Sequence, residues 1–131
     1  MIESETVVTD PETGEKYYGS LEAVLENAEA GDEVQLKKEE VVLEKDLEIP
    51  EDVALLIPDG ATLTVPEGTT LENNGLVVND SENGIVINEG SAINNGTILG
   101  DGTIVNNDGS LDLTEGITGN AVDSTPNGIV K

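Results

Sequence analysis

Two turns rich in side-chain oxygen atoms are the segments of this sequence best suited to chemistry. They are residues 79–84 (Asn-Asp-Ser-Glu-Asn-Gly) and residues 106–112 (Asn-Asn-Asp-Gly-Ser-Leu-Asp). Calcium prefers carboxylate and amide oxygens as ligands, so the weak calcium candidates are Asp80, Glu82, Asp108 and Asp112. Neither turn has the spacing of an EF-hand loop, and such residues are common in turns that bind no metal. We therefore expect no metal or cofactor, with calcium as the one candidate.

The side chains used by most enzymes are missing from the composition. The 131 residues include no Cys and no His, and all five basic residues are lysines. A Ser or Thr nucleophile needs a base to activate it, and the sequence offers no His for that role. Paired carboxylates can hydrolyse glycosides, but no acid lies among aromatic residues that would hold a sugar. We expect a protein that is not an enzyme and has no catalytic residue.

The strong negative charge limits the partners. The chain carries 28 acids against five lysines, a net charge of −23. Nucleic acids and anionic lipids need a basic surface, so neither is an expected partner. No segment is long and apolar enough for membrane insertion. The N-terminus, Met-Ile-Glu-Ser-Glu, lacks the basic and apolar regions of a signal peptide.

Tyr17 and Tyr18 are the only aromatic residues. Aromatic rings supply large contact surfaces with a polar end. The two tyrosines are therefore the weak binding candidates if the chain recognises a glycan or a surface protein.

The N-terminal elements differ from the rest of the chain. Residues 1–19 contain two β-prone segments around a turn, which predicts a hairpin. Residues 20–30 carry Leu21, Val24, Leu25 and Ala28 at helical spacing, behind Ser20 as the N-cap and before Gly31. We expect one capping α-helix over residues 20–30.

Residues 32–118 contain very short β-prone segments separated by turns with Gly or Pro. The phrase Asn-Asn-Gly at residues 73–75 recurs at residues 94–96, a spacing of 21. Three short strands and three turns fill about 20 residues, which is one rung of a three-sided parallel β-solenoid. The prediction is mainly β, with about four rungs in one domain spanning residues 1–131. An antiparallel sandwich is the alternative, because Asn-Gly turns also join hairpins.

Several details of the solenoid follow from this prediction. Stacking would place Asn73 beside Asn94 and Asn74 beside Asn95 as short amide ladders. Residues 37–46, rich in Lys and Glu, are predicted to form an outward loop, and residues 119–131 a C-terminal tail or cap. The predicted inward residues of the strands are Val34, Leu36, Leu47, Ile49, Val53, Leu55, Leu63, Leu71, Val77, Ile85, Ile87, Ile93, Ile98, Ile104, Leu111 and Ile117. An uncovered C-terminal edge would favour a weak end-to-end dimer over a monomer.

The segment Ser20–Leu36, an amphipathic helix that ends in Ala-Gly-Asp and continues into a strand, resembles the start of pectin-lyase-like β-helix proteins. The Pro-acid phrases at residues 50–52, 58–60 and 66–68 are similar to the corners of such domains in bacterial cell-surface proteins. The resemblance covers roughly residues 17–120 and implies a right-handed parallel β-helix with the helix lying across its N-terminal end. Lyases of this fold use Arg or Lys beside calcium, and its hydrolases use clustered Asp with His and Arg. Since this chain has no Arg or His, and Lys131 is its only lysine after residue 45, the resemblance carries over no catalytic residue.

These observations favour a non-catalytic structural or display module of a cell-surface or adhesin-type protein, located outside the cell. The restricted composition also fits an engineered or consensus sequence. A glycan- or protein-binding module is the alternative, and a relic of a calcium-dependent polysaccharide lyase or hydrolase is a weaker one.

Overall fold

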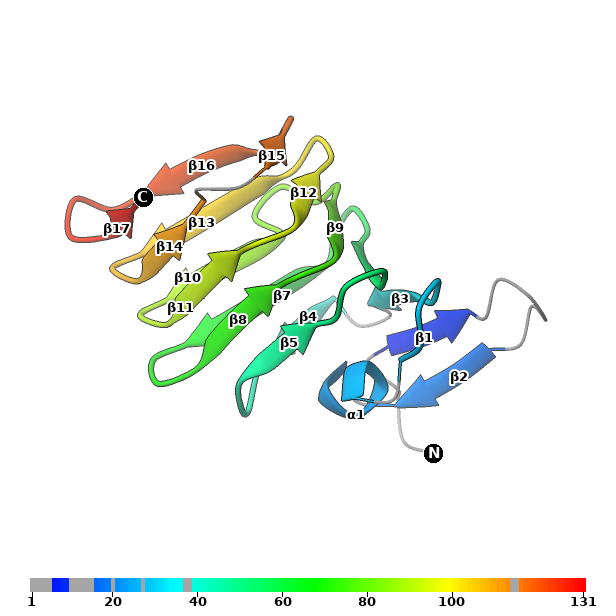
Figure 1. Ribbon diagram of the computed structural model, residues 1–131. Coiled ribbons are helices and arrows are strands. Elements are labelled where there is room, and N and C mark those ends of the chain that lie inside the picture. The colour runs from blue at the N-terminus through cyan, green and yellow to red at the C-terminus, as the bar shows by residue number, and fades with distance from the viewer. Residues whose placement is uncertain (1–5, 10–15, 20, 27, 37–38, 114–115) are drawn as a thin grey trace.

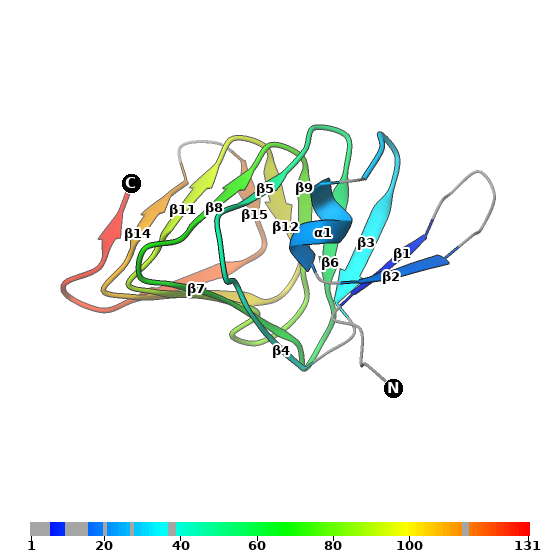
Figure 2. The ribbon, with the colours of Figure 1, turned by 90° about the horizontal axis from the view of Figure 1, so that it is seen from below.

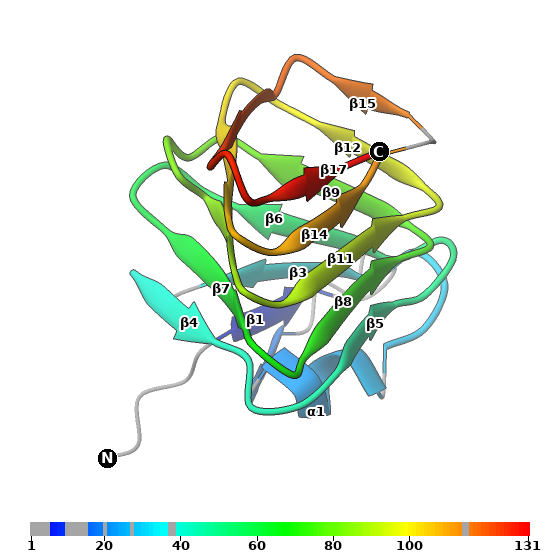
Figure 3. The same cartoon turned by 90° about the vertical axis from the view of Figure 1, so that its left-hand side faces the viewer.

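The computed structural model describes residues 6–9, 16–19, 21–26, 28–36, 39–113 and 116–131. From Glu33 onward the chain winds as a coil with three faces, and each face is a sheet (Figure 3). Within this coil every paired strand runs parallel to the strand one turn later in the chain. The predicted right-handed parallel β-helix is confirmed, and the antiparallel sandwich is wrong.

Each face of the coil contains five strands, stacked in layers along its axis (Figure 1). The first face consists of β3 (Glu33–Leu36), β6 (Ala54–Ile57), β9 (Leu76–Asn79), β12 (Thr97–Leu99) and β15 (Ile117–Thr118). The second face consists of β4 (Glu40–Val42), β7 (Thr62–Pro66), β10 (Ile85–Asn88), β13 (Thr103–Asn107) and β16 (Ala121–Ser124). The third face consists of β5 (Leu47–Ile49), β8 (Thr70–Asn73), β11 (Ser91–Asn94), β14 (Ser110–Asp112) and β17 (Ile129–Val130).

Alternation along each strand places aliphatic side chains inside, where they stack in columns from layer to layer. Column A contains Val34, Leu55, Val77, Ile98 and Ile117. Column B contains Val41, Leu63, Ile85, Ile104 and Val122. Column C contains Leu47, Leu71, Ala92, Leu111 and Val130. Among the described residues, the core is therefore built of aliphatic side chains.

A helix lies across the N-terminal end of the coil, and a hairpin continues the first sheet beyond β3 (Figure 2). Strands β1 (Thr6–Thr9) and β2 (Lys16–Gly19) pair antiparallel, where the sequence predicts a hairpin. Strand β1 also pairs antiparallel with β3, which covers the outer edge of the first face. Helix α1 (Leu21–Glu26) packs against β5, and its Leu21 and Leu25 are buried in the core. Among the described helices, none has the length and apolar character needed to cross a membrane.

The helix is shorter than predicted. The sequence predicts residues 20–30, whereas α1 covers Leu21–Glu26, and Ser20 lies outside the described residues. The carboxylate of Asp32 accepts a hydrogen bond from the backbone N–H of Glu29 at 2.9 Å, within a turn. Such local side-chain bonds compete with helical ones, and here the turn leads the chain into β3.

The prediction that residues 37–46 form an outward loop is wrong for the described part, residues 39–46. Strand β4 lies there, and Val41 and Leu43 are buried. Val41 pairs with Leu63 of the next layer. The charged residues next to Val41 and Leu43 indicated an exposed loop, although the inward side of this segment is apolar.

Two further predictions need correction. Ile93 is half-buried, and Ala92 takes the inward position of β11 between Leu71 and Leu111. Residues 119–131 are neither a loose tail nor a cap, because β16 and β17 add a further layer to the coil. Parallel pairing with the preceding layer gives these backbone groups partners that a free tail would lack.

Candidate functional site

The four weak calcium candidates lie on separate parts of the coil. Asp80 and Glu82 are exposed in the corner between β9 and β10, whereas Asp108 lies in the corner between β13 and β14. Asp112 is at the end of β14. Among the described residues, no group of three or more acids is arranged to hold a metal ion. The structure does not bring the four candidates together, and calcium binding stays a prediction.

The two binding candidates lie in β2 of the N-terminal hairpin. In the backbone pairing, Tyr17 lies opposite Val8 and Tyr18 opposite Val7. The side chains of this hairpin lie outside the described part of the structure, so glycan or protein binding by the tyrosines also stays a prediction.

A column of acids, of which only Asp108 was a candidate from the sequence, lies on the corner between the second and third faces. Glu67, Glu89 and Asp108 occupy this corner in three successive layers, and all are exposed. Their spacings of 22 and 19 residues match the period of the coil. That match is the signal that could have identified them. Glu89 and Asp108 both have positive φ, of 65° and 60°, because the chain turns sharply there.

Stacking of like charges changes the acidity of this column. The pKa of Glu89 is raised above its ordinary value of 4.5, first by a hydrogen bond with the Glu67 carboxylate and then by the charge of that group. Partial desolvation and the charge of Asp108 raise it further. Asp108 is also engaged within the chain, since its Oδ1 accepts a hydrogen bond from Thr125 Oγ1 at 2.6 Å. The carboxyl groups of Glu67 and Glu89 can share a proton, but both side chains are exposed on a corner of the coil.

A groove separates α1 from β5 at the N-terminal end. Its volume is about 310 Å³. It is lined by Glu22, Leu25, Glu26, Lys45, Asp46, Leu47, Glu48 and Pro50.

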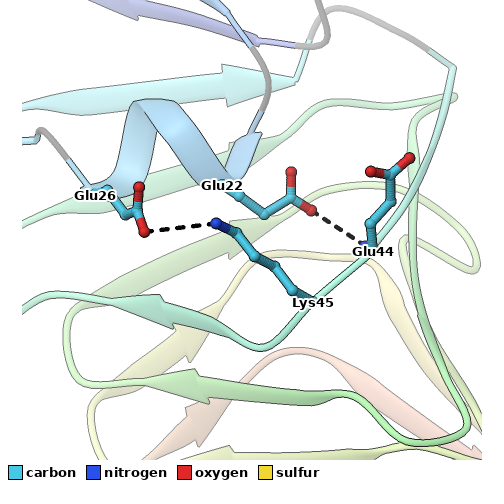
Figure 4. Close-up of polar contacts among 4 residues, drawn as sticks. All are labelled: Glu22, Glu26, Glu44 and Lys45. Carbon is cyan, nitrogen blue, oxygen red and sulfur yellow. Dashed lines mark hydrogen bonds and ion pairs between the residues drawn. The ribbon is translucent and has the colours of Figure 1, made fainter.

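The polar groups of this groove contact one another or the coil. Lys45 Nζ lies 3.6 Å from Glu26 Oε1, and Glu22 Oε1 accepts a hydrogen bond from the backbone N–H of Glu44 at 3.4 Å (Figure 4). Asp46 accepts a hydrogen bond from the N–H of Thr70, and Glu48 from the amide of Asn74. These contacts connect the helix and the first layer to the coil. The Lys45–Glu26 pair is largely exposed and contributes at most about 1 kcal/mol.

A second, more open groove of about 430 Å³ follows the corner between the third and first faces. Asp32, Glu33, Glu51 and Asp52 line one part of it, and Gly75 and Gly96 line another. A Cβ at Gly96 would collide with the carbonyl oxygen of Gly75 in the layer below. The glycines are thus required for close stacking of the layers, which accounts for the shape of this groove without a ligand.

The buried polar side chains bind between layers. Asn73, Asn79, Asn94 and Asn106 are each at most 2% exposed. Asn73 Nδ2 donates to the carbonyl oxygen of Thr97 at 3.0 Å, and Asn79 Nδ2 donates to that of Thr103 at 3.1 Å. Asn94 and Asn106 donate in the same way to later carbonyls.

The same asparagines also bind the corner that follows their strand. Asn73 Oδ1 accepts a hydrogen bond from the N–H of Gly75 at 3.1 Å, and Asn79 Oδ1 accepts one from the N–H of Ser81 at 3.2 Å. We call the four buried residues Asn73, Asn79, Asn94 and Asn106 the corner asparagines. The predicted ladders are confirmed, since Asn73 donates to Asn94 at 2.8 Å and Asn95 donates to Asn74 at 3.0 Å.

Asn106 departs from this pattern. Its Oδ1 is buried and has no hydrogen-bond partner among the described residues. The N–H of Asp108, which corresponds to the N–H of Gly75 and Ser81 in the other corners, donates instead to Thr125 Oγ1 at 2.8 Å. The corner therefore uses the threonine of the last layer in place of the asparagine.

Comparison of the chain with protein-family models, curated proteins and solved structures gave no match.

Proposed function

We propose that the chain is a non-catalytic structural module of the β-helix type, acting as a spacer or display platform in a cell-surface protein outside the cell. The observation that carries this proposal is the use of the corner asparagines. Their amides form hydrogen bonds with backbone groups of the next layer. The corner asparagines are buried, and their hydrogen bonds hold successive turns of the coil together, as a rigid scaffold requires.

The outer surface supports the same role. The corner acids Glu67, Glu89 and Asp108 are exposed, and the net charge of the chain is −23. A strong charge of one sign keeps a scaffold soluble and resists non-specific association. The corners therefore suit the display of inserted segments.

The test inserts a short neutral epitope between Glu82 and Asn83, both of which are exposed in the corner between β9 and β10. We expect the insertion to be displayed to an antibody with the melting temperature nearly unchanged. The matched control places the same epitope between Ile104 and Val105 inside β13, where it should unfold the coil.

A parallel assay offers acidic polysaccharides and a glycan array to the same protein. We expect neither turnover nor binding. Turnover that disappears in Glu89→Gln, or glycan binding that disappears in Tyr17→Ala and Tyr18→Ala, would contradict the proposed role.

A further inference from the structure

The two ends of the coil differ in how well their core is covered. At the N-terminal end, Val34, Val41 and Leu47 begin the three inward columns and are 0%, 1% and 4% exposed. At the C-terminal end, Val122 and Val130 terminate columns B and C and are 38% and 44% exposed. Both valines stack on fully covered residues, Ile104 and Leu111. The described residues thus supply a cover at one end of the core only.

The backbone at the C-terminal end is also open. The N–H groups of Ala121 and Thr125 donate to the carbonyl oxygens of Gly102, in the corner before β13, and of Asn106, within β13. Alternate residues of a strand direct their peptide groups to opposite sides. The peptide groups of Val122 and Ser124 therefore face away from β13, along the free edge of β16. A free edge of this kind is a template for pairing with another strand.

The charge at this end differs from that of the rest of the molecule. From Gly116 to Lys131 the sequence contains one acid, Asp123, and one lysine, Lys131, whereas the whole chain contains 28 acids. A second copy can therefore approach this end against less repulsion than it would meet at the acidic corners. The corners carry exposed acids, and at the N-terminal end the inward columns begin with the covered residues Val34, Val41 and Leu47.

We propose that the C-terminal layer is a self-association surface, and that its occupant is the same layer of a second copy turned end for end. Turning a copy over reverses the direction in which its strands run around the coil. Each edge then meets its counterpart antiparallel, with β16 against β16 and β15 against the β17 of the other copy. The contact is a twofold one in which each surface binds itself. It covers the open ends of the columns and gives partners to the free peptide groups of β16.

The experiment is sedimentation velocity on the intact chain over a roughly hundredfold range of concentration, in low and high salt. We expect dimers that increase with concentration and with NaCl, because salt screens the remaining repulsion. Val122→Asp and Val130→Asp should each weaken association at least about tenfold. The matched control is Val42→Asp, which adds the same charge at a valine that is 46% exposed on the outer side of β4.

Hydrogen exchange of the unmodified chain tests the same surface without a substitution, so it applies even if an end variant unfolds. The amides of Val122 and Ser124 should become more protected as concentration rises, and those of β4 should not. A monomer at every concentration and salt would overturn the proposal. So would association that Val42→Asp weakens as much as the end variants do, or protection of the Val122 and Ser124 amides that is independent of concentration.

Discussion

Each corner asparagine lies at or next to the last residue of a strand, where the chain leaves one sheet and bends toward the next. The regular ladder ends there, so the first amides of the corner need other partners. An Asn side chain both accepts and donates, and Asn73 uses both functions, toward Gly75 N and toward Thr97 O and Asn94 Oδ1. In the preceding layer the same position is Ile49, which provides only apolar contact. At the residue scale, the corner asparagines replace hydrophobic stacking by directional bonds.

The first prediction concerns this amide ladder. Asn73→Ala removes the partners of Gly75 N and Asn94 Oδ1 within the interior, and unsatisfied buried groups cost roughly 1–3 kcal/mol. We expect a loss of that size in the free energy of unfolding, measured in urea. Asn95→Ala is the control, since Asn95 is exposed and its amide donates to Glu72 and Asn74 at the surface. Equal losses for the two variants would show that burial of the ladder has no special importance.

The second prediction concerns Glu89, whose pKa is raised chiefly by its hydrogen bond with Glu67. A carboxyl group with a raised folded pKa holds its proton longer in the folded state than in the unfolded state. Its contribution to stability is therefore complete below the ordinary pKa of 4.5 and declines as pH rises through the folded pKa. Glu89→Gln removes the ionisation and can keep a hydrogen bond to Glu67.

The measurement is the unfolding free energy of both proteins as a function of pH. The stability of the variant relative to the unmodified protein should increase as pH rises above about 4.5 and then level off at neutral pH. Glu82→Gln is the control at an exposed acid of another corner. A relative stability of Glu89→Gln that is constant from acidic to neutral pH would contradict the coupling to Glu67.

At the scale of elements, the repeating coil could be predicted from the sequence, but the details that depend on neighbouring layers could not. Short apolar segments at a spacing near 20 residues predicted the coil because each must pair with its equivalent one turn later. The position of Ala92 was missed because β11 contains both Ala92 and Ile93, and hydrophobicity alone favours Ile93. The pairing of Ala92 with Leu71 and Leu111 places Ala92, and not Ile93, on the inward side of β11. This register cannot be predicted from one strand alone.

The candidate site was less predictable than the fold. Asp108 was predicted only as a calcium candidate and Glu67 only as part of a corner phrase, and Glu89 was not considered, although the spacings of the three acids follow the period of the coil. The groove between α1 and β5 depends on where the helix rests on the first layer, at Lys45 and Asp46. That docking is a tertiary property, with no repeat in the sequence to indicate it.

The third prediction is that Ala92→Val stabilises the protein. Ala92 interrupts column C between two leucines and lines a small apolar void together with Leu71 and Leu111. Two added methyl groups gain up to about 1.5 kcal/mol if they enter the void, and a branched residue suits a strand. We expect a higher midpoint of urea unfolding.

The control for the void is Ala61→Val, at an alanine that is 4% exposed and does not line the void. Overpacking there should cost about 1–3 kcal/mol. If Ala92→Val destabilises the protein as much as Ala61→Val, column C has no free space at Ala92.

At the scale of the whole molecule, the coil gathers acids that an unfolded chain keeps apart. Stacking repeats the corner acids layer after layer, and the net charge is −23. Among the described residues, the one ion pair is the exposed contact of Lys45 with Glu26. Repulsion therefore outweighs attraction in the folded state, and folding proceeds because hydrophobic burial and hydrogen bonds between layers exceed it.

The fourth prediction follows from this balance and concerns the melting temperature in NaCl. At 0.1 M salt the Debye length is about 10 Å, so screening strongly reduces the repulsion between exposed acids that lie farther apart than this, whereas a single exposed ion pair has little stabilisation to lose. The melting temperature should therefore rise with NaCl, by about 4 °C for each kcal/mol of repulsion removed. Choline chloride at equal ionic strength should have the same effect, and a larger effect of CaCl₂ than of MgCl₂ at equal ionic strength would indicate a calcium site. A melting temperature that stays constant or falls as NaCl is added would mean that repulsion between the acids does not destabilise the folded state. That result would contradict the repulsion inferred from the stacked corner acids of this coil.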